Sequence, residues 1–370
     1  MRLPVSLERP ASVVADLSDT DDASVARTAF ARRTTAKATT HALRAVGLLL
    51  ALGLLALLAL LSVAVGAASI PVGTVWDALW RFDGSYDHTV VMELRVPRTV
   101  LGVAVGAALG LAGALMQALV RNPLADPGLL GVNMGATAAV VAAVFVFGLT
   151  DPGVYVWFSF AGAALTAALV YFLGTRGRTG ATPVRLALAG TAVGAVLLGL
   201  VNAVITVNEF VFDELRFWQV GSLAGRDLEV LAQVAPFLLA GIAVSLFLGP
   251  ALNAVALGED LAAALGANIN RIRLLTALAV VLLCGAATAA AGPIAFVGLA
   301  VPHVARLVTG PDQRWVLPYS AVLAAVLLVG ADTLGRVVLP SGELEVGIIT
   351  AFVGAPVFIA LVRRTRAAQP

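Results

Sequence analysis

Apolar windows of membrane-spanning length follow one another along most of the chain. A helix needs about 20 consecutive apolar residues to cross a bilayer. Charge-free windows of this kind run over residues 45–68, 99–120, 128–149, 153–174, 186–208, 230–250, 274–292, 294–309, 315–337 and 346–362. The pattern therefore predicts an all-α membrane protein with about ten transmembrane helices, or nine if Gly292 and Pro293 do not divide the run Leu274–Pro302.

Composition supports a membrane location. Of the 370 residues, 60% are hydrophobic and only 12% are charged, and the mean hydropathy is +0.96, which is incompatible with a soluble domain that hides its apolar residues inside. The net charge of +2 does not indicate nucleic-acid binding, because the basic residues are dispersed among loops and form no basic stripe.

The two ends of the chain differ from its apolar body. Residues 1–41 are polar, with four aspartates followed by basic residues, and show no sustained apolar periodicity, so we expect a disordered cytosolic tail there. The first apolar window is too long for the core of a signal peptide and is expected to remain as the first span. The predicted division is a tail over 1–41, a membrane domain over 42–366 and a short C-terminal tail over 367–370.

The basic residues predict the orientation. With a cytosolic amino terminus, 18 of the 24 Lys and Arg residues lie inside, as the positive-inside bias requires, and both termini are cytosolic. The six remaining arginines lie outside and oppose that bias: Arg81, Arg95, Arg98, Arg216, Arg226 and Arg336.

Small residues predict close helix packing. Gly102, Gly106 and Gly110 recur every four positions, and Gly190 and Gly194 repeat the spacing. Such glycines let helix backbones approach each other in lipid, where no hydrophobic effect drives association. We interpret all five as packing residues.

A charged, helix-forming segment between two spans, Leu252–Leu275, is the clearest candidate for docking. Helix formers fill residues 254–265, Glu259 and Asp260 would lie in a first turn after Gly258, and Gly266 is placed to end the helix. We predict a cytosolic docking helix within residues 252–273.

Residues for catalysis, metal binding or ATP binding are scarce. Lys37, the only lysine, precedes Ala38, so the chain has no phosphate-binding G-x-x-x-x-G-K-[ST] loop. The sole cysteine, Cys284, lies in a span and is interpreted as a small core residue, and no two of the three histidines have metal-ligand spacing. The sequence indicates no enzyme, no cofactor and no metal site, and any ATP must be handled by a partner.

Ionisable residues inside the spans would mark an ion pathway, and they are few. Asp332 is the clearest, and Arg336, four residues later on the same helical face, is its simplest partner. A proton-coupled carrier would be expected to show more and deeper carboxylates.

Several motifs, in order, resemble the membrane permeases of ABC importers for iron–siderophore complexes, haem and vitamin B12, the FecCD or vitamin B12-permease type. The matching stretches are RVPRT at 95–99, GALMQALVRNPLADPGLLGVNMGA at 113–136, FWQVGSLAG at 217–225, ALGEDLAAALG at 256–266, AGPIAFVGLAVPHVARLVTG at 291–310 and GELEVGIITAFVGAPVF at 342–358. The resemblance covers about residues 45–366.

The resemblance implies a set of partners: a second permease subunit, identical or paralogous, two cytosolic ATP-binding subunits, an extracytoplasmic substrate-binding protein and the surrounding membrane lipid. It also implies that the segment between the sixth and seventh spans seats in a groove on the ATPase. The residues matching that pattern are Gly258, Glu259, Ala263, Leu265 and Gly266.

The same resemblance matches Arg95, Arg98 and Arg336 with outer arginines that meet carboxylates of the binding protein. Rim charges of this kind mainly set association rate and orientation. A local explanation stands beside it, in which Arg95 pairs with Glu93 and Arg336 with Asp332.

The span near 184–208 resembles the helix that lines the translocation path. Its polar residues are Thr191, Asn202 and Thr206, with Thr182 near the cytosolic end. A weakly polar path suits a bulky chelate, whereas a naked metal ion would need oxygen or nitrogen ligands.

One departure from the family pattern lies before the last span, where Glu345 replaces the usual proline of E-[LI]-P-V-G and can add an acid on the outer side. The function that we expect is a permease subunit for a ferric siderophore, powered by partner ATPases. Vitamin B12 or haem is the alternative within the family, and an ion-coupled secondary transporter is the alternative outside it.

Overall fold

The computed structural model describes residues 19–66, 69–175, 183–339 and 342–367. The chain forms two units, residues 1–47 and 48–370. The described part of the first unit, from Asp19 onward, is helical and belongs to α1, Asp19–Ala64. This differs from the unstructured tail expected over 1–41: alanines recur through residues 23–38, and alanine has the highest helix propensity.

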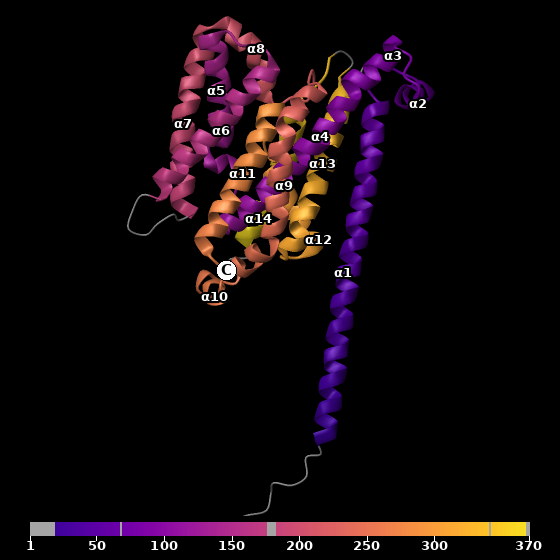
Figure 1. Ribbon diagram of the computed structural model, residues 1–370, viewed down its shortest axis with the longest axis vertical. Coiled ribbons are helices and arrows are strands. Elements are labelled where there is room, and N and C mark those ends of the chain that lie inside the picture. Colours follow the sequence, from indigo (N-terminus) through magenta and orange to yellow (C-terminus); the bar gives the residue numbers. More distant parts are fainter. Residues whose placement is uncertain (1–18, 67–68, 176–182, 340–341, 368–370) are drawn as a thin grey trace, which may run out of the picture. The chain divides into compact units, whose positions relative to one another are not determined.

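The second unit is helical throughout the stretches that the structure describes (Figure 1). After α1 its longer helices are α4 (Val96–Val120), α5 (Val132–Phe147), α6 (Pro152–Thr175), α7 (Pro183–Val207), α9 (Leu228–Ala256), α11 (Ile269–Ala291), α12 (Val297–Thr309), α13 (Gln313–Val338) and α14 (Val346–Ala367). The shorter elements are α2 (Val72–Trp80), α3 (Tyr86–Thr89), a π-helical turn η1 (Val90–Arg95), a 3₁₀ turn η2 (Pro127–Leu130), α8 (Glu209–Val220) and α10 (Glu259–Ala264).

Each of the ten predicted windows contains one of these helices. Among the described residues, seven helices are long and apolar enough to cross a membrane, whereas α5, α12 and α14 supply shorter apolar segments of 16, 13 and 15 residues. The predicted break in Leu274–Pro302 is confirmed: α11 ends at Ala291, and Gly292 and Phe296 adopt positive φ angles of 74° and 67° before α12 begins. A 13-residue helix is only about 20 Å long, so α12 alone is shorter than the hydrocarbon layer.

Helix α4 is the central helix of the second unit, packed by α13, α11, α12 and α9. Two of its glycines pack closely against α13, in agreement with the predicted packing role: a Cβ on Gly106 would lie 2.6 Å from the Ala325 Cα, and one on Gly110 would meet the backbone of Ser320. Gly190 likewise faces the backbone of Leu129 on the turn η2. For Gly194 the packing prediction was wrong, because a Cβ there would meet only the Met134 side chain at an ordinary 3.8 Å.

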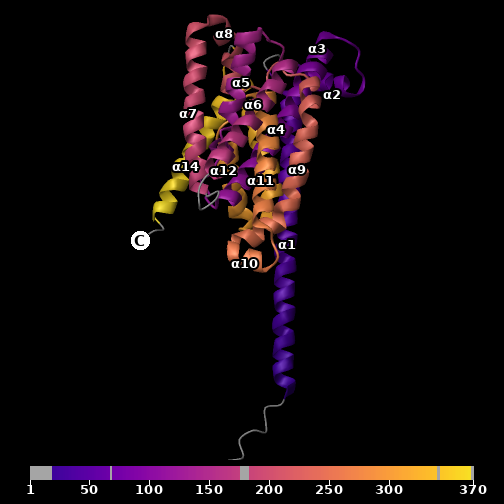
Figure 2. The same ribbon diagram turned by 60° about the vertical axis from the view of Figure 1, so that its left-hand side comes forward.

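The elements of the second unit define two opposite ends. α10 lies at one end, and α2, α3 and α8 lie at the other (Figures 1 and 2). Each end has polar contacts between helices. At the α10 end, the Asn253 amide donates to Asp312 over 2.6 Å, and at the other end Arg98 binds Asp332. We call these the α10 end and the arginine end.

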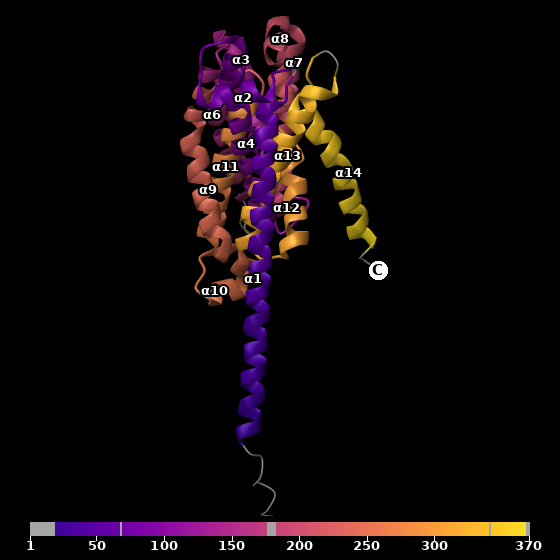
Figure 3. The ribbon, with the colours of Figure 1, turned by 90° about the vertical axis from the view of Figure 1, so that its right-hand side faces the viewer.

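Two helices are packed on one side only. α7 contacts mainly α6, α5 and η2, and α14 contacts α13 and α12. Figure 3 shows α14 leaning away from the other helices toward its C-terminal end. Most of the apolar surface of α7 is consequently exposed within a single chain, with only 11% of its most apolar window buried.

Candidate functional site

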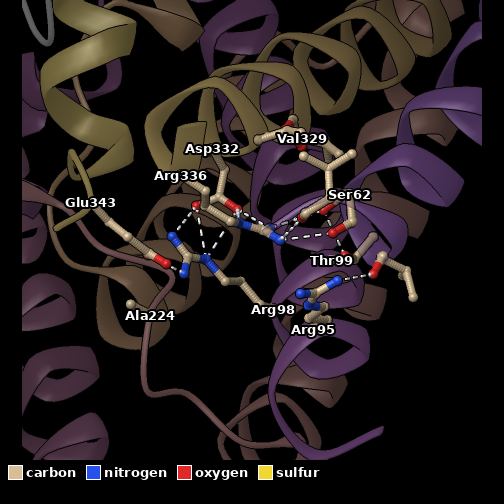
Figure 4. Close-up of polar contacts among 12 residues, drawn as sticks. Ser62, Arg95, Arg98, Thr99, Ala224, Val329, Asp332, Arg336 and Glu343 are labelled. Atoms are coloured by element: carbon tan, nitrogen blue, oxygen red, sulfur yellow. Dashed lines mark hydrogen bonds and ion pairs between the residues drawn. The ribbon is translucent and has the colours of Figure 1, made fainter. Parts of the chain in front are cut away.

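A network of charged side chains joins three helices at the arginine end (Figure 4). At its centre is Asp332 of α13, whose carboxylate accepts hydrogen bonds from two guanidinium groups. Arg98 of α4 donates through Nε to both carboxylate oxygens at 3.0 and 3.1 Å, and Arg336 donates through Nε at 3.1 Å and through Nη2. Asp332 and Arg336 are 2% and 4% exposed, so this shared pairing is buried.

The same network holds the end of α1. The last carbonyls of a helix have no partner within that helix, and cationic side chains are well suited to them. Arg95 Nη1 donates to the carbonyls of Val63 at 3.1 Å and Ala64 at 2.8 Å, while Arg336 Nη1 donates to the carbonyl of Ser62 at 2.7 Å. Arg336 also donates to the Ser62 hydroxyl, so arginines from two other helices cap α1.

Arg98 has a second, more exposed partner. Its Nη1 lies 2.6 Å from an oxygen of Glu343, in the segment between α13 and α14, and this carboxylate is 31% exposed. A cavity of about 330 Å³ opens beside the pair, lined by Arg95, Arg98, Arg336 and Glu343 together with Tyr86, Gly225 and others. Asp332 and Glu343 pair with these arginines, and Glu345 and Asp87 are further acidic groups near Arg98 and Arg95, so the chain's own carboxylates largely balance the three guanidinium groups.

Glu345, the residue that departs from the family pattern, lies near this network. Its carboxyl is half-buried, and burial raises the pKa of Glu345 above its usual value of 4.5; a hydrogen bond with Ser222 and the nearby Arg98 partly oppose that shift. Burial therefore favours the neutral form of the Glu345 carboxyl more than it favours that of an exposed glutamate.

The predicted docking segment is a short helix between two glycine turns at the α10 end. α9 ends at Ala256, Gly258 has φ 120° and ψ 147°, and α10 begins at Glu259. The helix predicted over residues 254–265 is therefore divided, because only glycine readily adopts the backbone conformation of Gly258. The predicted start at Glu259 is confirmed, and Gly266, with φ 85°, follows the end of the helix as expected.

The surface of α10 is apolar and open. Leu257, Leu261 and Leu265 follow one another at four-residue intervals and are 65%, 50% and 67% exposed, whereas Ala262 is fully buried against the rest of the chain. Only Leu261 lies within α10: Leu257 precedes the non-helical Gly258, and Leu265 is the residue that ends the helix, so the three leucines share an exposed segment and not one helical face. Ala263 and Gly266 are exposed as well, so of the predicted coupling residues only Gly258 is partly covered.

Glu259 holds α10 in place rather than facing away from the protein. One of its carboxylate oxygens lies 2.7 Å from Arg273 Nη2 on α11 and 3.6 Å from Arg121 Nη2 at the end of α4. Arg121 also donates to the Val255 carbonyl at 2.9 Å. These contacts connect the docking segment to α4 and α11.

The predicted path residues lie together on α7. Thr191, Asn202 and Thr206 are exposed in the single chain and lie within about 60° of one another around the helix. Thr191 and Thr206 donate to the carbonyls of Ala187 and Asn202, so their hydroxyls are satisfied without a ligand. Thr182 lies outside the described residues.

The interior polar contacts are structural. Cys284 is 1% exposed, as predicted for a small core residue, and its Sγ and the Thr288 hydroxyl both donate to Asn133 Oδ1 at 3.3 and 3.2 Å. Gln117 accepts from Arg306 and donates to the Leu299 carbonyl. Within the described ranges, no three His, Cys, Asp or Glu side chains are grouped so that they could hold a metal ion.

Comparison with known proteins decides the family. The model of the FecCD transport family matches residues 54–364. The chain belongs to the FecCD transport family. Members of this family are permease subunits of ABC transporters, which are transport proteins and not a family of enzymes. The apolar helices of this chain are those of a multi-pass membrane protein.

Several FecCD relatives are similar over most of their length. The ferric enterobactin transport system permease protein FepD of Escherichia coli is 49% identical over 82% of this chain and 90% of its own. The Fe(3+)-citrate import system permease protein YfmD of Bacillus subtilis is 43% identical over 82% and 90%. The iron(3+)-hydroxamate import system permease protein FhuB of Bacillus subtilis is 42% identical over 82% and 79%.

A solved structure shares the fold. One chain of a metal-chelate type ABC transporter in an inward-facing conformation superposes with a TM-score of 0.75, at 28% identity, over 86% of this chain and 98% of the other. The predicted family is thus confirmed, and so is an ABC permease fold that is helical over the described residues, while the count of ten transmembrane helices stays a prediction.

Two sets of residues escaped the sequence reasoning. Ser62 and Glu343 complete the arginine network, but they come from segments far from Arg98 in sequence, so no local spacing could connect them. Leu257 and Leu261 recur with Leu265 at four-residue intervals in the sequence, but the break at Gly258 means that this spacing does not place them on one helical face.

Proposed function

We propose that this FecCD chain is the membrane permease subunit of an ABC importer for ferric siderophore complexes. The observation that carries the proposal is the shared chemistry of the relatives' names: enterobactin, citrate and hydroxamate systems all handle Fe(III) held in an oxygen-rich chelate. Identities of 42–49% over four-fifths of the chain support a cargo of that class more than vitamin B12 or haem.

The motor would dock at the α10 end. The sequence has no phosphate-binding loop, so the energy for transport would come from a partner. In this family, that partner is a pair of ATP-binding subunits. The exposed leucines of this segment, Leu257, Leu261 and Leu265, which we call the leucine stripe, suit an apolar groove, since exposed apolar surface marks interaction sites. Gly258, Glu259, Ala263 and Gly266 would shape and hold this helix.

The binding protein would dock at the arginine end. Arg95, Arg98 and Arg336 line a cavity at this end, and their guanidinium groups can bind carboxylates on a partner. Their burial limits how they can act: Arg95 and Arg336 are bound to α1, and Arg98 has the most accessible position because its outer partner Glu343 is partly exposed.

A second permease subunit would cover the exposed sides of α7 and α14. Thr191, Asn202 and Thr206 would then face the path between the two subunits, with Thr182 at its inner mouth. A path with so few polar groups would let a bulky chelate pass without holding it tightly.

The topology that we propose has ten crossings and both termini in the cytosol. The shorter helices α5, α12 and α14 would complete the seven long spans, with the irregular segments before α5 and α12 buried by neighbouring helices. The tail over 1–41, the membrane domain over 42–366 and the end over 367–370 remain the proposed division.

Uptake measurements test this function. Cells lacking the gene, with and without a plasmid copy, are supplied with radiolabelled ferric enterobactin, citrate and hydroxamate, and with vitamin B12 and haem as competing cargoes. We expect uptake of at least one ferric chelate that depends on the copy and stops when ATP is depleted under a maintained membrane potential. Uptake that continues without ATP and stops when the potential is dissipated would instead establish a secondary transporter.

A further inference from the structure

The short helix α2, Val72–Trp80, is not explained by the transport function. It follows the end of α1 at Ala64 and precedes α3, so it lies at the arginine end beside the ends of two spans. One side of it packs into a small apolar cluster made by Val63, Ile70, Val75, Ala78 and Val91. α2 is therefore fixed to the outer ends of α1 and η1.

The apolar surface of α2 is wider than the side that packs. Val75 and Ala78 are 5% and 1% exposed, yet Val72, Trp76 and Trp80 are 73%, 62% and 72% exposed. At about 100° per residue, these three exposed side chains lie within about 80° of one another. They form a second apolar face next to the buried one.

The remaining side of α2 is polar. Gly73, Thr74 and Asp77 fall on the arc opposite the apolar faces at the same angular spacing. The helix thus has three sides: one packs against the protein, one is apolar and exposed, and one is polar and suited to contact with water. This division is expected of a helix that lies flat in a membrane interface.

Aromatic residues extend the uncovered apolar face. The Trp76 and Trp80 rings lie 5.9 Å apart, and Phe82 and Tyr86, just beyond the helix, are 54% and 77% exposed. Tryptophan and tyrosine are enriched where the hydrocarbon layer meets the headgroups, because an apolar ring and a polar N–H or O–H suit that boundary. Arg81, at the end of α2, is exposed and can reach lipid phosphate.

We propose that α2 is an interfacial anchor that lies in the outer headgroup region of the bilayer with Trp76 and Trp80 in contact with lipid. Continuity with the lipid-facing surface of the spans supports lipid as the occupant. Leu60 and Leu61 in the last turns of α1 and Leu94 in η1 are 61%, 42% and 57% exposed, and these two elements pack with α2 through Val63 and Val91. By holding α1 and η1 at a fixed depth, the anchor would also fix the depth of Arg95, which binds the end of α1.

Spin labelling tests this placement with a control on the same helix. Cys284, the sole cysteine, is replaced by serine, and single cysteines are introduced as Trp76→Cys, Trp80→Cys or Asp77→Cys. The labelled proteins are reconstituted in vesicles of phosphatidylcholine and phosphatidylglycerol, and collision rates with oxygen and with a water-soluble nickel chelate are measured. We expect labels at 76 and 80 to favour oxygen several-fold over the label at 77.

Two results would overturn the proposal. Equal access of the nickel chelate to all three positions would place the exposed face of α2 in water. Labels at 76 and 80 that are immobilised and shielded from both reagents would mean that a protein surface covers them.

A second measurement covers the case in which these variants fail to fold. Native tryptophan fluorescence is quenched with nitroxide lipids labelled at the headgroup or deep in the acyl chain, in the unmodified protein and in Trp76→Phe/Trp80→Phe. Removing both residues is expected to lower the headgroup-specific quenching measurably. The remainder would come from Trp157 and Trp315, which are partly exposed, whereas Trp218 is only 2% exposed and packs against Tyr155. Unchanged headgroup quenching would contradict the anchor.

Discussion

The two ends of this FecCD permease handle their exposed groups in opposite ways. At the arginine end, three guanidinium groups that are candidates for docking already bind Asp332, Glu343 and the last carbonyls of α1. At the α10 end, three leucines lie in the open with no partner side chains over them. The charged groups of the arginine end are paired within the chain, whereas the leucines of the α10 end are exposed.

This difference indicates how each end can bind a partner. An apolar stripe gains free energy simply by being covered, so α10 is ready for an apolar groove without any prior rearrangement. A docking carboxylate at the arginine end must instead compete with carboxylates that the chain itself provides. Binding at α10 should therefore depend on hydrophobic contact, and binding at the arginine end on charge and ionic strength.

The largest effect is expected from Asp332→Asn. The substitution leaves Arg98 and Arg336 buried without their shared negative charge, and breaking a buried ion pair in this way costs about 3–5 kcal/mol. Thermal unfolding of the purified protein in detergent checks the loss. As a control, Glu259→Gln at the α10 end removes a partly exposed pair, for which about 0.2–1 kcal/mol is expected. Equal losses in the two variants would mean that the arginine end is not the more tightly bound one.

A large effect on assembly, without an effect on folding, is expected from Leu261→Asp. The side chain is half exposed, so unfolding should change by no more than about 0.5 kcal/mol. A charge at the centre of an apolar contact should weaken binding of the ATP-binding subunit at least tenfold, about 1.4 kcal/mol. Co-expression with that subunit and measurement of ATPase activity in the purified complex check it.

The matched control for this substitution is Leu334→Asp, on the exposed surface of α13 and away from α10. It is expected to reduce membrane insertion or stability without a selective loss of the ATP-binding subunit. If Leu261→Asp retains full ATPase activity in the complex, the leucine stripe is not the docking surface.

A pH-dependent effect is expected from Glu345. Burial raises the pKa of Glu345, so above its usual value of 4.5 and up to its folded-state value the folded protein binds more protons than the unfolded one. Stability from this group is consequently highest below pH 4.5 and falls as the pH rises through the folded-state pKa. Glu345→Gln should match the unmodified protein at pH 4.5 and exceed it near neutral pH, in unfolding temperatures measured across that range.

Much of the fold could be predicted because each transmembrane helix is its own local signal. The length of the apolar windows located the helices, and glycine spacing marked close-packing positions on α4 without indicating the partner helix. What local sequence could not predict is pairing at a distance: Arg95 and Arg336 bind the carbonyls of Ser62, Val63 and Ala64, groups that every residue carries and that no motif marks. The packing of Gly194 failed for the same reason, because spacing alone does not show which side of a helix has a neighbour.

Outside the spans, the short helices differed in how clearly the sequence indicated them. α2 was not predicted, because its nine residues are too few for an apolar window of membrane-spanning length. Its buried, exposed apolar and polar residues nevertheless fall on three separate sides of the helix. α10 was found because its flanking glycines are visible in the sequence. Their exact consequence, the break at Gly258, follows from a backbone angle of 120° that the identity of the residue permits but does not require.

The smallest change in stability, and the most direct test of the contrast between the two ends, is expected from Glu343→Gln. Glu343 is the one carboxylate of the described arginine network that is substantially exposed, so losing its pair with Arg98 should cost only about 0.2–1 kcal/mol. If Glu343 occupies the position that a partner's carboxylate takes, removing its charge should make docking of the binding protein tighter and more sensitive to salt. The measurement is the dissociation constant of the complex in nanodiscs at low and high ionic strength. Weaker docking would mean that Glu343 positions Arg98 for the partner, and that the arginine end is built to receive an anion without any exchange.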